Sequence, residues 1–375
     1  MTRPLQLAFI GGAADSIIGT SHQCAATLDG HFEIFTGCFS RNQERSSASG
    51  AAFGVPAERC YSHWQDMLNA HADQLDAVAI LTPTPDHCAM LKALIPTGLA
   101  IICEKPMVSS AADAREIREL QKVHDAFIAV TFNYNAYPMV RELRQRVSAG
   151  HLGELWQYQM EMPQASMAPV LDFDAAPSLR WRIEPDPDAL PTVLGDLGSH
   201  AIDMVRFTTG QLPTQVFASM ASHNPNLPDY LDDARLLLRY ESGLHGSIWS
   251  SSTATGNRHD MRLRLYGSEA GAAWLQDNPE EIHLSRINGQ REIIDRASPH
   301  LAVSDPGVER MKPGHPAGFI EAFANLYADF ATCLRQGQQY SALTSTVEQS
   351  LAGLEIMEAA MRSHHSGSWE LVTYG

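Results

Sequence analysis

The sequence predicts an α/β fold with a doubly wound parallel sheet for the first third of the chain. Short apolar runs bounded by Gly, Pro or polar residues alternate there with amphipathic stretches of helical length. A glycine-containing turn directly follows the first run. Polar and charged residues follow the later runs, at the strand ends where such sheets bind ligands.

Five apolar runs are expected to be the buried strands, and the stretch 109–124 is expected to be a helix capped by Ser109 or Ser110. The strands are residues 5–10, 32–39, 77–81, 100–103 and 127–130. Later, short strand-like patterns separated by turn residues indicate a second, β-rich domain: 215–220, 234–240, 246–251, 261–266, 272–276 and 281–285. Residues 318–334, rich in Phe and Ala, are expected to form a helix with an apolar, core-facing side. We therefore predict domains at 1–135 and 136–375.

Composition limits the possible partners. The 375 residues are 44% hydrophobic, enough for two cores, and 27 Lys+Arg against 43 Asp+Glu give a net charge of -16. This charge repels nucleic acid and anionic membranes, so neither is an expected partner.

The N-terminal apolar run is too short for a signal peptide and no stretch suits a membrane span, so a cytoplasmic protein is expected. The six cysteines are scattered without a CxxC pair, which favours reduced core thiols and no metal site.

The turn after the first strand runs from Gly11 to Gly19. Backbone N–H groups and a helix N-terminus can approach a pyrophosphate at such a turn. Its candidate nucleotide-binding residues are Gly11, Gly12, Ala13, Ser16 and Ile17. A strict GxGxxG starting at Gly11 would need Gly at Ala13 and Ser16, so a plain structural turn explains this motif about as well.

Ser40 and Arg41 follow the second strand, where an NAD-specific site usually carries an acidic side chain for the ribose hydroxyls. Three interpretations of Arg41 stay open: it pairs with a 2′-phosphate, it stacks on adenine, or it is a solvated surface charge. These two residues therefore leave the choice between NAD and NADP open.

Three further motifs follow in order: Thr82-Pro83 with His87, Glu104-Lys105-Pro106, and Asp196 with Gly198, His200 and Asp203. With the glycine turn, they make the chain resemble the Gfo/Idh/MocA family of nicotinamide-dependent oxidoreductases, most closely its inositol and aldose dehydrogenases. The resemblance covers nearly the whole chain. It implies an NAD or NADP cofactor, with a slight preference for NAD from the family's polyol oxidisers. It also implies a Rossmann domain followed by an α+β domain with a large, mostly antiparallel open sheet, whose C-terminal helices pack back on the Rossmann domain.

Oxidation of a secondary alcohol needs a proton acceptor near the hydroxyl and a hydride acceptor on the other side of the carbon. His200 suits the first role, and Asp196 shares its face if this stretch is helical. The resemblance places Lys105 beside the nicotinamide, where its charge can stabilise an alkoxide, and suggests a cis Lys105–Pro106 bond. Glu104 either orients Lys105 or contacts the nicotinamide ribose.

The remaining candidates are less specific. Thr82, Pro83 and His87 are expected near the cofactor, although His87 is almost as well explained as an ordinary helix residue. Candidate substrate contacts are Asn133, which is also a cofactor candidate, Tyr134, Arg180, Arg182 and His315, with His315 acting in its own or a neighbouring subunit. Surface pairing explains Arg180 about as well. A metal held by Asp196, His200 and Asp203 is disfavoured because no further ligand cluster supports it.

These observations predict a dehydrogenase that oxidises a cyclic polyol or sugar and assembles as a homo-oligomer, a dimer or tetramer. Two alternatives stay open. One is an NAD-dependent glycosidase that uses the same site, and the other is a non-catalytic nucleotide-sensing protein with the same fold.

Overall fold

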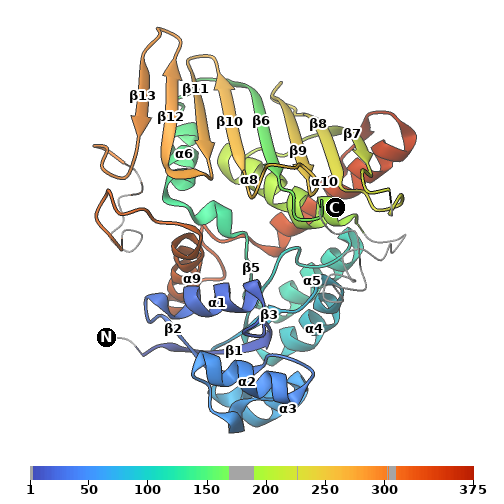
Figure 1. Ribbon diagram of the computed structural model, residues 1–375, viewed down its shortest axis with the longest axis vertical. Helices are drawn as coiled ribbons and strands as arrows, with labels where there is room; N and C mark the ends of the chain where they lie inside the picture. Colours follow the sequence, from blue (N-terminus) through green and yellow to red (C-terminus); the bar gives the residue numbers. More distant parts are fainter. Residues whose placement is uncertain (1–2, 169–189, 226, 302, 304–309) are drawn as a thin grey trace. The chain divides into compact units, whose positions relative to one another are not determined.

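The computed structural model describes residues 3–168, 190–225, 227–301, 303 and 310–375 (Figure 1). These residues form two compact units. The first contains the chain up to Val108, Ala112–Ala136 and Gly318–Ser350, and the second contains Ser109–Ala111, Tyr137–Ala317 and Leu351–Gly375. Arg180 and Arg182, two of the predicted substrate contacts, lie outside the described residues.

The first unit holds a parallel sheet of five strands in the order β2-β1-β3-β4-β5. The strands are β1 (Leu5–Gly11), β2 (Phe32–Cys38), β3 (Ala77–Leu81), β4 (Ala100–Cys103) and β5 (Ile128–Val130). The helices are α1 (Ile17–Leu28), α2 (Gln43–Phe53), α3 (Trp64–His71), α4 (His87–Leu94), α5 (Ala111–His124) and α9 (Phe319–Gln336), with short 3₁₀ segments η1 (Ala57–Arg59), η2 (Ala72–Gln74), η3 (Thr84–Asp86), η4 (Ile95–Thr97) and η5 (Asn133–Ala136). The predicted doubly wound parallel sheet is confirmed.

Burial explains why this sheet could be predicted. Every residue of β3 and β4 is buried, so both strands consist of continuous apolar sequence. Helix α9, from the far end of the chain, completes the same core: its Phe323, Tyr327 and Phe330 belong to one cluster with Phe32 and Phe9. The helix begins where Glu321 accepts a hydrogen bond from the Gly318 N–H at 2.9 Å, and it ends at Gly337 in the left-handed conformation.

The second unit holds a nine-stranded sheet in the order β13-β12-β11-β10-β6-β9-β8-β7-β14. All neighbouring pairs are antiparallel except β6 and β9, so the prediction of a large, mostly antiparallel sheet is confirmed. Its strands are β6 (Leu155–Pro163), β7 (Gln215–Ala221), β8 (Asp233–Arg239), β9 (His245–Ser251), β10 (Arg262–Gly267), β11 (Ala270–Leu275), β12 (Asn278–Arg286), β13 (Arg291–Ile294) and β14 (Glu370–Leu371).

Helices cover one face of this sheet and leave the other exposed. In the described residues, the helical elements are α6 (Pro138–Ser148), the π-helical segment η7 (Val193–Gly198), α8 (Ser199–Thr209) and α10 (Val347–Ser366). Helices α6 and α8 contact each other and the strands β6, β9, β11 and β12 (Figure 1). In the described part of the chain, no helix is long and apolar enough to cross a membrane.

Candidate active site

The candidate residues of the first unit gather at one edge of its sheet. Gly11 pairs with Leu81 on β3, and Cys103 on β4 pairs with both Ile80 and Val130. The residues that end or follow these strands, Gly11, Thr82, Glu104 and Thr131, therefore lie along the carboxyl edge. Strand β1 lies between β2 and β3, at the point where the strand order reverses, and sheets of this kind bind ligands there.

The glycine turn is shaped by close backbone approaches. Gly11 and Gly12 have φ values of 83° and 70°, and a Cβ on Gly11 would lie 2.8 Å from the Leu81 carbonyl oxygen. Gly19, in the first turn of α1, passes so close to the loop that its Cβ would lie 2.2 Å from the Gly12 oxygen. Gly19 thus provides the close packing that a GxGxxG motif obtains from its third glycine. Its longer spacing is the reason that motif reasoning did not assign it a role.

The start of α1 suits an anionic ligand. The Ser16 side chain caps the helix by accepting a hydrogen bond from the Gly19 N–H at 2.9 Å, and the next residue, Ile17, is 82% exposed. A narrow backbone turn at a helix N-terminus fits the pyrophosphate of a dinucleotide. Gly11, Gly12, Ala13 and Ser16 would hold it, and Ile17 offers an apolar surface beside it.

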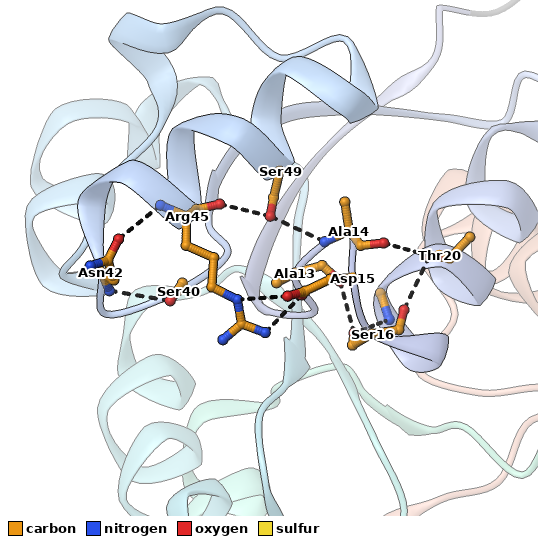
Figure 2. A network of polar contacts seen from close by, with 10 residues as sticks. Ala13, Ala14, Asp15, Ser16, Thr20, Ser40, Asn42, Arg45 and Ser49 are labelled. Atoms are coloured by element: carbon orange, nitrogen blue, oxygen red, sulfur yellow. Dashed lines mark hydrogen bonds and ion pairs between the residues drawn. The ribbon is translucent and has the colours of Figure 1, made fainter. Parts of the chain in front are cut away.

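Side chains of α2 form hydrogen bonds and an ion pair with this loop (Figure 2). The Arg45 guanidinium donates to both carboxylate oxygens of Asp15, at 3.1 and 2.7 Å, and the Ala14 N–H donates to Ser49 at 3.1 Å. The hydrogen bond from Arg45 lowers the pKa of Asp15 and, reciprocally, raises the pKa of Arg45. The negative charge of Asp15 beside the turn is therefore balanced by the positive charge of Arg45.

Ser40 and Arg41 lie where β2 leads into α2. The Ser40 hydroxyl accepts a hydrogen bond from the Asn42 N–H at 3.2 Å, and Asn42 in turn caps α2 (Figure 2). Arg41 is highly exposed and forms an ion pair with Asp86 at 2.7 Å. Neither residue is acidic, so the carboxylate nearest to Arg41 in this ion pair comes from Asp86 and not from the residues that follow β2.

His87 connects two strand-end loops. It is the first residue of α4 and is almost completely buried. Its Nε2 contacts the Thr82 carbonyl oxygen at 2.7 Å, while its Nδ1 contacts the carbonyl oxygens of Pro106 and Met107 at 3.1 and 3.2 Å. Burial lowers the pKa of His87. His87 thus holds the loop of Thr82 and Pro83 against the segment that follows Lys105.

Glu104 faces the protein interior. Its Oε1 contacts His22 Nε2 at 2.9 Å and accepts a hydrogen bond from the Thr131 hydroxyl. Burial raises the pKa of Glu104, but the hydrogen bond and charge of His22, the charge of Lys105 and the Thr131 hydroxyl outweigh it, so the net pKa is lowered. Lys105 is half-buried, and the Lys105–Pro106 bond is cis, as the resemblance suggested.

Asn133 and Tyr134 follow β5 in the short helix η5, and both are buried. Among the residues that the structure describes, the buried Asn133 Nδ2 donor finds no hydrogen-bond partner, so a ligand could supply its acceptor. The Tyr134 ring packs edge-on against Phe319 with centroids 6.1 Å apart. Tyr134, a candidate substrate contact, therefore also packs against an apolar side chain of the first unit.

Asp196 and His200 belong to the second unit. The predicted helix is present, but Asp196 lies in the π-helical turn η7, while His200 follows in α8. Such widened turns occur often at functional sites. Asp196 is partly exposed and His200 is 7% exposed.

Two other candidates in this unit have structural contacts. Asp203 accepts hydrogen bonds from Arg206 at 2.9 and 2.7 Å, one helical turn away. His315 lies in an exposed loop, where its Nδ1 contacts the Lys312 carbonyl oxygen at 3.2 Å and its own carbonyl accepts a hydrogen bond from Arg296 at 2.8 Å. Across the described residues, no group of three or more His, Cys, Asp or Glu side chains could hold a metal ion.

Family models and known proteins match this sequence over most of its length. The model of an oxidoreductase family with an NAD-binding Rossmann fold matches residues 5–132, and that of the GFO/IDH/MocA C-terminal domain matches residues 140–273. The uncharacterized oxidoreductase YfiI of Bacillus subtilis is 27% identical over 98% of this chain and 96% of its own. The inositol 2-dehydrogenase of Rhizobium meliloti is 27% identical over 80% of this chain and 81% of its own.

Solved structures agree with these matches. An inositol dehydrogenase homolog from Azotobacter vinelandii, crystallised with NADH and myo-inositol, superposes with a TM-score of 0.88 at 26% identity over 98% of both chains.

Proposed function

Because the chain belongs to the Gfo/Idh/MocA family of oxidoreductases, we propose that it is an NAD(P)-dependent dehydrogenase that oxidises a secondary alcohol of a cyclic polyol or sugar. One observation carries the proposal: the glycine turn and Lys105 lie at the same carboxyl edge of one parallel sheet. The inositol 2-dehydrogenase and the NADH and myo-inositol complex among the relatives support this substrate class.

In this proposal the nicotinamide, when bound, supplies the hydride acceptor. His200 takes the proton from the substrate hydroxyl, since a neutral imidazole nitrogen is a hydrogen-bond acceptor that can serve as a general base. Lys105 places a positive charge where the alkoxide develops. Asp196 and Asn133 bind neighbouring hydroxyl groups and orient the ring.

The test is reduced nicotinamide formation, followed by absorbance, with NAD and NADP in parallel against inositols, aldoses and their acids. Turnover with one stereochemical group of substrates is expected and would also decide the cofactor. Lys105→Ala and His200→Asn should each lower kcat at least a hundredfold while nucleotide affinity changes little. Wild-type turnover in either variant would remove that residue from the mechanism.

Other outcomes would favour the two alternatives. Release of an aglycone from a glycoside without net reduced nicotinamide would favour the glycosidase. Tight nucleotide binding with no turnover on any substrate would favour the sensor.

We also propose that the exposed face of the nine-stranded sheet forms a contact between copies of the chain. Strand register places Leu237 and Tyr266 on the same face, and both side chains are exposed. Apolar side chains on an uncovered sheet favour association. Light scattering should show a dimer or tetramer, and a single species of 41.1 kDa would contradict the proposal.

A further inference from the structure

A buried chain of polar side chains extends from Glu104 into the core of the first unit. His22, on the second turn of α1, contacts Glu104 through Nε2 at 2.9 Å and the Tyr327 hydroxyl through Nδ1 at 2.6 Å. The Thr131 hydroxyl reaches the same carboxylate oxygen from the end of β5. His22 and Tyr327 are completely buried, and Thr131 and Glu104 are nearly so. Helix α1 and the ends of β4 and β5 thus meet at one carboxylate, and α9 joins them through the contact of Tyr327 with His22.

One arrangement of protons satisfies these contacts without charging the ring. The Tyr327 hydroxyl donates to Nδ1, the Nε2–H donates to Glu104, and the Thr131 hydroxyl donates to the same carboxylate. Glu104 is then ionised and accepts both bonds. The walls around His22 are apolar, since Phe323 packs against its ring with centroids 4.6 Å apart and Phe9 packs at 6.3 Å.

Glu104 is the residue directly before Lys105, so its orientation and charge bear on the lysine. The titratable groups that face Glu104 come from every element around it: His22 of α1, Tyr327 of α9, His87 of α4, and its chain neighbours Cys103 and Lys105. His22 provides the direct hydrogen bond and Lys105 the adjacent cation. Loss of the His22 donor would leave a buried carboxylate with one donor fewer, and such a carboxylate binds a proton more readily.

We propose that His22 is a positioning residue for Lys105: it holds Glu104 in one orientation and ionised, so that Lys105 lies beside a fixed negative charge. The proposal rests on the catalytic role proposed for Lys105. It gives the histidine on the nucleotide-binding helix α1 a role in the chemical step. It also explains why α9, from the far end of the chain, provides a tyrosine hydroxyl at this point.

The test uses the full-length protein and the pH dependence of kcat/KM. In the wild type Glu104 stays ionised through the neutral range, because its pKa is lowered from the ordinary value. His22→Leu removes the donor and so raises the pKa of Glu104. The acid limb of the kcat/KM profile, where activity is lost on lowering the pH, should therefore move to higher pH by about one to two pH units. His22→Gln can still offer a side-chain N–H to Glu104 and should restore part of the shift.

Phe323→Leu is the matched control, because it loosens the packing around His22 but leaves every hydrogen bond in place. Its melting temperature should fall while its acid limb stays where the wild type has it. If His22→Leu lowers the melting temperature but leaves the acid limb in place, the histidine is only structural and the proposal is wrong.

An infrared titration of the Glu104 carboxylate, identified as the band that Glu104→Gln removes, needs no turnover. It separates this proposal from the proposed function. If no substrate is oxidised, the dehydrogenase assignment fails, but a higher titration midpoint in His22→Gln than in the wild type still supports the network. An unchanged midpoint in both His22 variants overturns it, whatever the enzyme does.

Discussion

Gly19→Ala tests whether the close approach of α1 to the glycine turn shapes the nucleotide site. A Cβ at this position would lie 2.2 Å from the Gly12 oxygen and 2.4 Å from the Ala13 oxygen, far below the 3.4 Å of ordinary contact. Both neighbours are backbone atoms, so the loop must move by about 1 Å to make room. Overpacking of this kind costs about 1–3 kcal/mol, and the better helix propensity of Ala returns about 1 kcal/mol. A net loss of up to about 2 kcal/mol in the free energy of unfolding is therefore expected.

Gly353→Ala is the matched control. Gly353 also lies inside a helix, α10, but a Cβ there would meet no atom within 4 Å. This variant should gain about 0.5–1 kcal/mol in stability and bind nucleotide as the wild type does. Urea unfolding and calorimetric titration with NAD and NADP measure both effects. Gly19→Ala should bind at least tenfold more weakly because the displaced loop carries the N–H groups that face the pyrophosphate. Wild-type nucleotide affinity together with a gain in stability like that of Gly353→Ala would refute the reasoning.

Three further variants probe polar contacts. Arg45→Ala should weaken nucleotide binding a few-fold, because it leaves the Asp15 charge near the turn without its ion-pair partner. The loss should be larger at low salt, and calorimetry should show that adding Asp15→Asn restores the affinity. Burial raises the pKa of Asp76, but Arg3 and a backbone N–H lower it on balance. Asp76→Asn should therefore lose about 1 kcal/mol of stability above pH ~4, and its difference from the wild type should fade as urea unfolding is repeated at lower pH. Asp232→Ala removes a completely buried acceptor of two backbone N–H groups, so a loss of about 1–3 kcal/mol in urea at neutral pH is expected, and an unchanged midpoint would contradict that role.

The first unit could be predicted from local sequence because its strands are covered on both faces. A strand such as Ala77–Leu81 is apolar throughout, and polar residues bound it sharply. The second sheet was harder to predict, since one of its faces meets solvent and alternation is a weaker signal. Strand β6 was missed because exposed Trp156 and Gln157 interrupt the alternation of its sequence. Strands β13 and β14 were missed because four and two residues are too short to show a period.

The candidate site residues, too, could be predicted only where a local sequence pattern marks them. Motifs at strand ends predicted residues such as Gly11 and Glu104, because the carboxyl edge of a parallel sheet collects whatever follows each strand. Nothing local distinguishes His22, one polar residue in the helix Ile17–Leu28. Its importance comes from contacts with residues 82 and 305 positions away in the chain. Only the folded core brings those residues together.

The structure also changes how two of the sequence motifs are understood. Thr82 with His87, and Glu104-Lys105-Pro106, were separate signatures in the sequence, yet the His87 ring contacts the Thr82, Pro106 and Met107 carbonyl oxygens. Lys105 therefore stands between two anchors, because His22 holds the side chain before it and His87 holds the backbone after it. Both anchors are buried histidines on helices that begin at the carboxyl edge of the sheet. Two anchored neighbours restrict the backbone that carries Lys105. The role proposed for Lys105 needs such preorganisation, because a charge fixed in place stabilises an alkoxide better than a mobile one.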